Sequence, residues 1–170
     1  MHLPTLGSLR PHKDVPEWLV SDPIPVPYFD GSSLSFILDG LATEDLADAE
    51  AAIAGFLKLG PADRQAASSY LFQNYTELAD FVGADELPCE VPDAGKIWEY
   101  VTPVEIFVSR RQHRDRLIYL QITAECDWEP EYGLQIVYRK GTELSRVSDV
   151  DGHLTNSDAH DLPEDEDSIN

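Results

Sequence analysis

The feature that most constrains the fold is a run of four predicted β-strands between residues 97 and 156. Apolar and polar residues alternate most regularly over Leu117–Cys126, as in a strand with one buried face. The turns between the strands are short, and Lys140-Gly141 has the composition of a tight hairpin. Short turns join antiparallel neighbours, so the segment predicts a C-terminal antiparallel β-meander sheet with one buried face. Its strands are expected at 98–100 with 104–109, 117–126, 133–139 and 143–148.

The N-terminal part of the chain predicts a β-hairpin. Residues 1–16 look like an irregular arm, because they are rich in proline, histidine and glycine. Asp30-Gly31 is a turn signal between two extended segments, 24–29 and 34–38. The prolines in the first segment limit its hydrogen-bond donors, so it is expected at a sheet edge.

Helical periodicity follows the hairpin. Apolar residues recur at helical spacing over 44–59 and again over 62–82, which predicts an αα-hairpin laid on the sheet. The expected fold class is therefore α+β, in a single domain of residues 1–160. Residues 161–170 carry many carboxylates and few apolar groups, and we expect a disordered acidic tail there.

Charge is distributed unevenly along the chain. The 12 basic and 32 acidic residues give a net charge of −20. The acidity lies in residues 1–95 and 149–170, whereas residues 96–148 carry 8 residues of each sign. Such a field repels nucleic acid and anionic lipid, whose binding depends on lysine and arginine, and it attracts a basic protein. The alternative explanation is that negative charge only maintains solubility.

The cellular setting is predicted from what the sequence lacks. No apolar run reaches the roughly 20 residues that span a bilayer, and the N-terminus has no signal-peptide pattern. Two cysteines, Cys89 and Cys126, are too few for a disulfide scaffold. We therefore expect a cytoplasmic protein with reduced thiols, and neither a membrane nor a nucleic-acid partner.

The only dense basic cluster lies in the turn between two predicted strands. It comprises Arg110, Arg111, Arg114 and Arg116, with His113 among them. Guanidinium groups bind carboxylates and phosphates bidentately, so the cluster is a candidate anion-binding site. The favoured alternative is a hairpin tip whose arginines pair with the acidic surface or with the tail.

The next turn alternates carboxylates around aromatic residues. The candidate partner-binding residues here are Glu125, Asp127, Trp128, Glu129, Glu131 and Tyr132. Carboxylates beside aromatic side chains could steer a basic protein and anchor it. Two alternatives stay open: an exposed loop whose tryptophan packs on the sheet edge, and a site for a hard cation or for acid–base chemistry.

No catalytic or metal motif is complete. Asp149-Val150-Asp151-Gly152 resembles the start of a calcium loop, but its glycine is two positions early and His160 stands where glutamate is required. No cysteine or histidine pair has zinc-like spacing, and no nucleophile elbow or phosphate loop is present. We therefore assign no metal, cofactor or catalytic residue.

Four segments together resemble an uncharacterised bacterial domain family of unknown function. They are Ile97–Pro103, Tyr119–Ile122, the stretch from Glu125 to Tyr138 with its Trp-Glu and Gly-Leu-Gln motifs, and Asp151–Asn156 with Asp-Gly-His-Leu-Thr. The resemblance covers about residues 97–158. It implies a bacterial, intracellular α+β domain with no established activity and no catalytic residues to transfer. Acidic α+β proteins of this kind also resemble immunity proteins of polymorphic toxin systems, in charge and style only.

Two functional hypotheses follow. The first is a non-catalytic protein-interaction module, of the kind formed by an immunity-like inhibitor of a basic partner. A homodimer, formed through a sheet edge or the arginine-rich turn, is compatible with it. The second is a small metal-dependent or carboxylate-based hydrolase using Asp127, Glu129, Asp151 or His153. That hypothesis requires these side chains to converge on one substrate.

Overall fold

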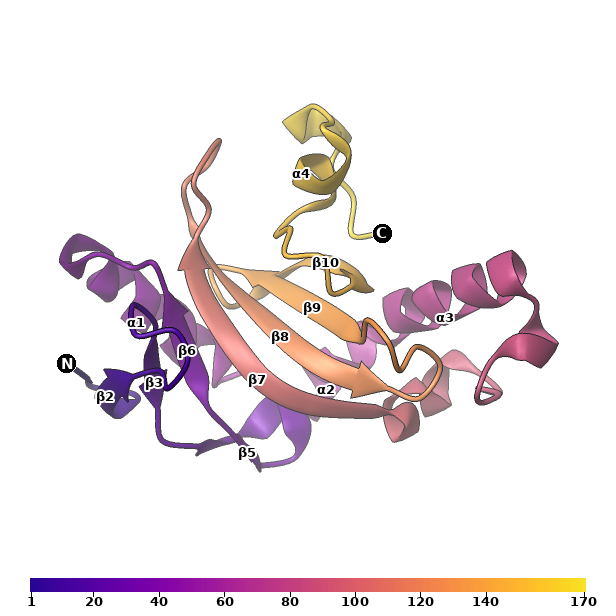
Figure 1. Cartoon of the computed structure of the whole chain (residues 1–170), viewed down its shortest axis with the longest axis horizontal. Coiled ribbons are helices and arrows are strands. Elements are labelled where there is room, and N and C mark those ends of the chain that lie inside the picture. Colours follow the sequence, from indigo (N-terminus) through magenta and orange to yellow (C-terminus); the bar gives the residue numbers. More distant parts are fainter.

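The computed structural model describes residues 1–170 and has an α+β fold built on one large mixed sheet (Figure 1). Strand β6 is parallel to β7, and the other neighbouring strands are antiparallel. In spatial order the strands are β1 (His2–Leu3), β2 (Gly7–Pro11), β3 (Leu19–Ser21), β6 (Phe36–Asp39), β7 (Val101–Arg110), β8 (Ile118–Cys126), β9 (Leu134–Arg139) and β10 (Glu143–Asp149).

The remaining elements are one small hairpin and several helices. The hairpin pairs β4 (Ile24–Val26) with β5 (Ser32–Leu34). The α-helices are α1 (Leu46–Phe56), α2 (Pro61–Ala66), α3 (Ser68–Val82) and α4 (Asn156–His160). The 3₁₀ segments are η1 (Pro27–Phe29), η2 (Thr43–Asp45), η3 (Ala84–Glu86), η4 (Ala94–Tyr100) and η5 (Glu164–Glu166).

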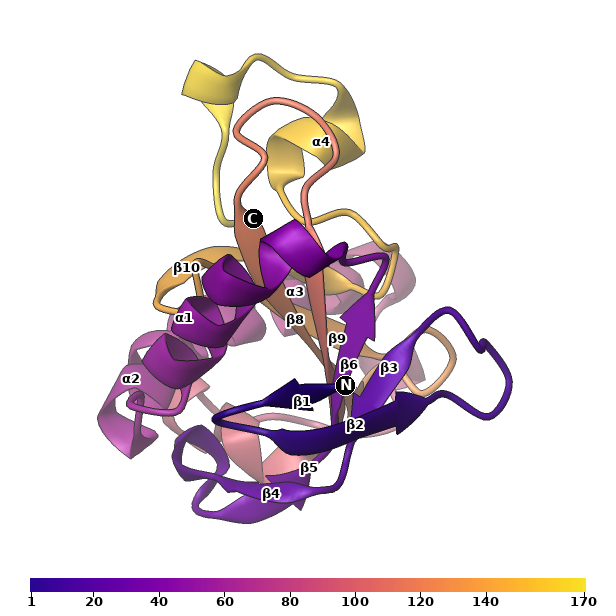
Figure 2. The same cartoon turned by 90° about the vertical axis from the view of Figure 1, so that its left-hand side faces the viewer.

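Helices α1, α2 and α3 cover one face of the sheet. The helices lie behind the strands in Figure 1, and α1 and α2 lie beside them in Figure 2. The core between these layers is rich in aromatic side chains. The ring of Tyr28 lies 5.4 Å from that of Phe56 and 5.7 Å from that of Tyr138. All three rings are buried, and the Tyr138 hydroxyl donates to that of Tyr28 at 3.0 Å. Burial of large rings with paired hydroxyl groups fixes how the helices sit on the sheet.

The predicted meander is confirmed in β7 to β10, which pair in chain order. The alternating residues Ile118, Leu120 and Ile122 are buried as expected. The expectation of a single buried face was wrong, however, because Tyr119 and Val137 on the opposite face are also fully buried. The segment that follows β10 turns back over this second face (Figure 1). A covering segment distant in sequence leaves no mark on the alternation of a strand.

Two N-terminal expectations need correction. Residues 1–16 are not irregular throughout, because they include β1 and β2. Leu3, Leu6 and Leu9 are buried there, and this apolar contact holds the arm against the core. The predicted hairpin turn at Asp30-Gly31 does join β4 to β5, with positive φ at both residues. Its second expected strand is divided, since the last part forms β6 in the main sheet.

The structure also differs from the prediction at 98–100 and in the second helix. Residues 98–100 belong to η4 rather than to a strand. There Ile97 is buried, and the Trp98 indole donates to Ser68 Oγ at 2.9 Å, so tertiary contacts override the strand-like composition. The helix expected over 62–82 is interrupted at Ala67 into α2 and α3.

The C-terminal residues 161–170, expected to be disordered, lie against the body of the protein. They contain η5, and Val147 N donates to the carbonyl oxygen of Ile169 at 3.0 Å. The side chain of Ile169 packs against the core. Two of the carboxylates that suggested disorder, Glu164 and Asp167, are instead paired with arginines, which composition alone does not reveal.

Candidate functional site

The arginine turn, residues 110–116 between β7 and β8, is held by carboxylates of the same chain. The side chain of Arg111 is only 3% exposed. Its Nε and Nη2 donate to the two carboxylate oxygens of Asp158 at 2.7 and 2.8 Å, and its Nη1 and Nη2 to those of Glu164 at 3.1 and 2.7 Å. The hydroxyls of Thr155 and Ser157 accept from the same guanidinium. Arg111 is therefore fully engaged by the C-terminal part of the chain.

The other arginines of the turn divide between two partners. Arg110 bonds Asp45 at 2.6 Å and Asp48 at 2.7 Å, at the start of α1. Arg114 donates to Glu164 at 2.9 Å, and Arg116 forms no ion pair. Three of the four candidate anion-binding residues thus bind carboxylates within the chain. This arrangement corresponds to the alternative in which the turn pairs with the acidic surface and the tail.

These contacts change the acidity of the carboxyl groups. Hydrogen bonds from Arg111, and then from Arg114, lower the pKa of Glu164 from 4.5 to about 2. The pKa of Asp158 is also lowered, chiefly by its hydrogen bond from Arg111. Both groups favour the charged form, so the arginine turn binds the C-terminal segment most strongly when these carboxylates are ionised.

We expect the stability of the protein to fall as the pH is lowered below about 5, and part of this fall to require Glu164. A carboxyl whose pKa is lower in the folded state contributes its full stabilisation above its unfolded pKa. That contribution disappears as the pH falls from about 4.5 towards about 2. Urea unfolding of Glu164→Gln at a series of pH values should therefore show a shallower acid dependence than the wild type.

The control for this prediction is Glu166→Gln, in the same 3₁₀ segment, because Glu166 is exposed and forms no ion pair. It should retain the wild-type dependence on pH. An unchanged pH dependence in Glu164→Gln would contradict the proposed role of its ion pairs.

The acidic loop, residues 125–132 from the end of β8 towards β9, presents a different arrangement. Glu125, Asp127 and Glu131 are exposed, and Tyr132 is 61% exposed. Glu129 shapes the loop, since its carboxylate accepts from the backbone N–H of Glu131 at 3.0 Å. No carboxylate of this loop takes part in an ion pair. Its negative charge is therefore available to a partner.

Trp128 does not fit the role predicted for it as an exposed anchor. Its side chain is 1% exposed and packs edge-on against Tyr75 of α3. Its indole N–H donates to Asn74 Oδ1 at 3.1 Å. The large apolar ring is more stable in the core than in water, so it fastens the loop to α3 instead of facing solvent.

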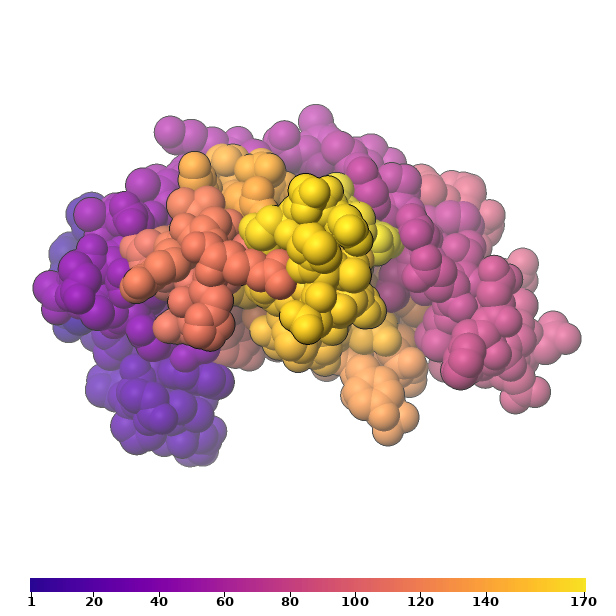
Figure 3. Space-filling view, turned by 90° about the horizontal axis from the view of Figure 1, so that it is seen from above, coloured from indigo at the N-terminus to yellow at the C-terminus, as the bar shows by residue number.

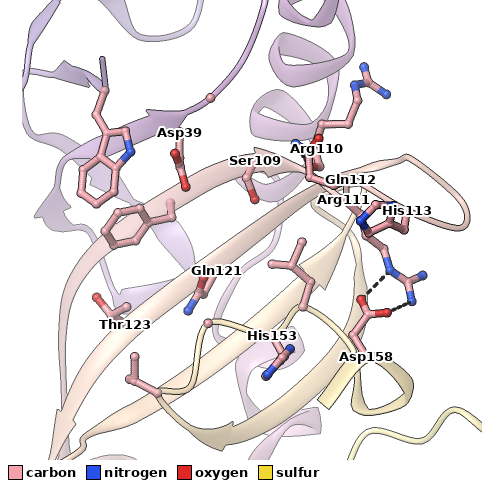
Figure 4. A pocket seen from close by; sticks show the side chains of 16 residues that line it. Asp39, Ser109, Arg110, Arg111, Gln112, His113, Gln121, Thr123, His153 and Asp158 are labelled. Atoms are coloured by element: carbon pink, nitrogen blue, oxygen red, sulfur yellow. Dashed lines mark hydrogen bonds and ion pairs between the residues drawn. The ribbon is translucent and has the colours of Figure 1, made fainter. Parts of the chain in front are cut away.

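A polar groove lies on the face of the sheet opposite the helices, between the arginine turn and the chain that follows β10 (Figure 4). Its volume is about 650 Å³. Asp39 of β6 and Ser109 of β7 are register partners on its floor, and Gln121 of β8 lies beside them. Trp18 and Phe107 form an aromatic wall, with ring centroids 5.3 Å apart.

The groove offers hydrogen-bonding groups, but its serine is not coupled to a base. Asp39 and Ser109 have no side-chain hydrogen bond or ion pair, and neither His113 nor His153 bonds Ser109. The sequence patterns did not predict that one groove would be lined by Trp18, Asp39, Ser109 and Gln121. The polar alternation of β8 was the only signal, because the parallel pairing of β6 with β7 joins segments far apart in sequence.

The residues of the hydrolase hypothesis occupy different places. Asp127 and Glu129 line a cavity of about 570 Å³ beside Cys89, whereas His153 lines the groove. Asp151 is held by Arg146 through bonds of 2.6 and 2.7 Å. Burial is the largest single influence and would raise the pKa of Asp151, but the hydrogen bonds from Arg146 and from the His153 backbone, together with the charge of Arg146, lower that pKa overall. No three His, Cys, Asp or Glu side chains form a cluster suited to a metal ion.

Comparison with known proteins identifies the family. No curated protein and no solved structure matches the chain. None of the helices combines the length and the apolar character needed to cross a membrane. The model of a family described as "Domain of unknown function (DUF6985)" matches residues 5–154. The match includes the arginine turn, the acidic loop and much of the N-terminal half, so it extends further towards the N-terminus than the resemblance over residues 97–158. The chain therefore belongs to this domain family of unknown function, DUF6985.

Proposed function

We propose that this protein is a non-catalytic interaction module that binds a basic protein partner through the acidic loop. The observation that carries the proposal is the contrast in ion pairing between the loop and the rest of the molecule. The loop's carboxylates are exposed or half-exposed and have no cationic neighbour, whereas most basic side chains are already bound inside the chain. A partner would supply the missing positive charge.

The electrostatic field supports this proposal. Only Lys13, Lys58, Arg116 and Lys140, among twelve basic residues, form no ion pair. Each ion pair neutralises charges of both signs, so the net charge of −20 remains on carboxylates that have no cationic partner in the chain. Complementary charge raises the association rate and selects basic surfaces, while it disfavours nucleic acid and anionic lipid.

An aromatic anchor is still available after Trp128 is assigned to the core. Tyr132 stands exposed beside Glu131, and tyrosine is among the residues that most often dominate binding energy at interfaces. The C-terminal end of α3, with Phe81 87% exposed, lies at the same end of the molecule as the acidic loop (Figure 1). Exposed apolar groups beside free carboxylates suit a protein partner better than a small cation.

The setting of this interaction is also part of the proposal. The free thiols of Cys89 and Cys126 suit a reducing compartment, so we place the protein in the cytoplasm. The sequence resemblance suggests a bacterial source. The likeness to immunity proteins in charge makes a basic toxin one candidate partner.

The proposal is tested by affinity capture with matched variants of the full chain. The loop variant carries Glu125→Gln, Asp127→Asn, Glu131→Gln and Tyr132→Ala, and leaves Glu129 to preserve the loop. The control variant carries Asp14→Asn, Glu17→Gln and Glu44→Gln, which remove equal charge from exposed positions elsewhere. Capture is performed from bacterial lysate at about 0.05 M salt, where surface charges are weakly screened.

A basic protein retained by the wild type and the control variant, but lost with the loop variant, is the expected result. The same pattern should then be measured with the recovered protein in purified form. Equal retention by all three proteins, or no basic protein retained by the wild type, would contradict the proposal.

A further inference from the structure

The C-terminal segment, residues 155–170, contacts the body of the protein as a bound peptide would. It comprises α4 and the acidic residues 161–170, and is called the tail below. Figure 3 shows the tail in yellow beside the arginine turn, and Figure 1 shows both rising from the same edge of the sheet. Two carboxylates of the tail, Asp158 and Glu164, accept hydrogen bonds from the buried guanidinium of Arg111. Arg114 donates to Glu164 as well. Bidentate guanidinium–carboxylate pairs are strong and geometrically selective contacts.

A second contact fixes the end of the tail. Strand β10 is an edge strand of the sheet, and its Val147 N–H donates to the carbonyl oxygen of Ile169 at 3.0 Å. The Ile169 side chain lines an apolar cavity of about 330 Å³ together with Leu59, Tyr70 and Leu144. A backbone hydrogen bond to a sheet edge, combined with a side-chain pocket, is a recurring mode of peptide recognition.

The family match covers the binding surface but not its occupant. Arg111, Arg114, Val147 and Leu144 lie within residues 5–154, the part matched by the family model. The tail lies outside that part. The tail is also exposed at Glu164, whose side chain is 44% accessible, and its helical segments span only five and three residues. Further carboxylates at Asp161, Asp165 and Glu166 form no ion pair, so the net negative charge of the protein disfavours these positions of the tail.

We propose that the arginine turn and the β10 edge form a binding site for an acidic peptide of another protein, which the tail occupies in cis. The ligand carries two carboxylates, spaced as Asp158 and Glu164 are, and an aliphatic residue near its end that replaces Ile169. This site is separate from the acidic loop and binds a ligand of opposite charge. The tail acts as an intramolecular competitor, since a tethered segment has a high effective concentration at its own site.

The test uses the full chain and a fluorescein-labelled synthetic peptide with the sequence of residues 155–170. A loosened variant carries Asp158→Asn, Glu164→Gln and Ile169→Ala, which weaken the tail's own contacts without removing any group of the binding surface. Fluorescence anisotropy at about 0.15 M salt should show the peptide binding the loosened variant at least roughly tenfold more tightly than the wild type. A peptide with Asn and Gln at the positions of Asp158 and Glu164 should bind neither protein.

Variants of the binding surface identify the site. In the loosened variant, Arg111→Lys should weaken peptide binding about tenfold or more, because an ammonium cannot form two bidentate pairs. Arg114→Gln changes a less buried residue and should weaken binding several-fold with the fold intact, which circular dichroism verifies. Glu17→Gln with Glu44→Gln, added as a control, should leave the affinity unchanged.

Three results would overturn the proposal. The first is no measurable binding of the peptide to the loosened variant. The second is binding that neither Arg111→Lys nor Arg114→Gln weakens. The third is dimerisation of the wild type on a sizing column at the concentrations used, which would assign the site to the tail of a second copy.

Discussion

Replacement of Gly141 by alanine is expected to destabilise the protein by about 2–5 kcal/mol, which combines overpacking with an unfavourable backbone conformation. Gly141 has a φ of +76° in the turn between β9 and β10. A Cβ at this position would lie 2.0 Å from the carbonyl oxygen of Ala52 and 2.8 Å from its carbonyl carbon. Both atoms belong to the backbone of α1, so the helix would have to move away from the sheet.

A matched control separates the two causes. Gly31 stands in the turn between β4 and β5 with a φ of +82°, and a Cβ there would meet no atom within 4 Å. Gly31→Ala should therefore destabilise the protein only by the roughly 1–2 kcal/mol that the left-handed conformation costs a residue with a Cβ. Urea unfolding followed by circular dichroism measures both variants. If the two substitutions destabilise the protein equally, the close approach of Gly141 to α1 adds no cost of its own, which would contradict the prediction.

Trp128→Ala is expected to lower the free energy of unfolding by about 3–5 kcal/mol, as for other large-to-small changes in a core. The ring is fully buried against Tyr75, and its removal also leaves Asn74 without its hydrogen-bond donor. The acidic loop would lose its attachment to α3. Binding of a partner should then weaken indirectly, through disorder of the loop rather than loss of a contact.

Tyr132→Ala is the companion measurement, because this exposed ring lies four residues further along the same loop. Its effect on stability should stay within about 0.5 kcal/mol, the usual range for surface substitutions. Thermal unfolding of both variants distinguishes the structural aromatic residue from the one available to a partner. A loss below about 1 kcal/mol in Trp128→Ala would show that the loop does not depend on this ring for its position.

Local patterns predicted the parts of the fold that local interactions determine. The alternation of β8, the Lys140-Gly141 turn and the helical periodicity of α1 and α3 all correspond to elements of the structure. What failed depended on contacts between distant segments. The parallel pairing of β6 with β7 brings Asp39 beside Ser109, and no pattern in either segment specifies that neighbour.

Contacts between distant segments also limited what could be predicted for the candidate site residues. Charge and spacing picked out the arginine turn and the acidic loop, but burial decided what each side chain does. Arg111 is buried because Asp158 and Glu164 return to it from 47 and 53 residues away. Trp128 is buried because α3 provides Asn74 and Tyr75. From the sequence alone, a side chain that is free to bind another protein cannot be distinguished from one that is buried by distant segments of its own chain.

We propose that the acidic loop is the preferred surface for positive charge on this protein. The most direct test is an NMR titration of the ¹⁵N-labelled full chain with a synthetic peptide of alternating lysine and glycine, at about 0.15 M salt, where distant surface charges are screened. The largest shifts should fall on the backbone amides of residues 125–132, and the loop variant should abolish them. Shifts spread evenly over the exposed carboxylates, including the regions of Glu17 and Glu44, would contradict it.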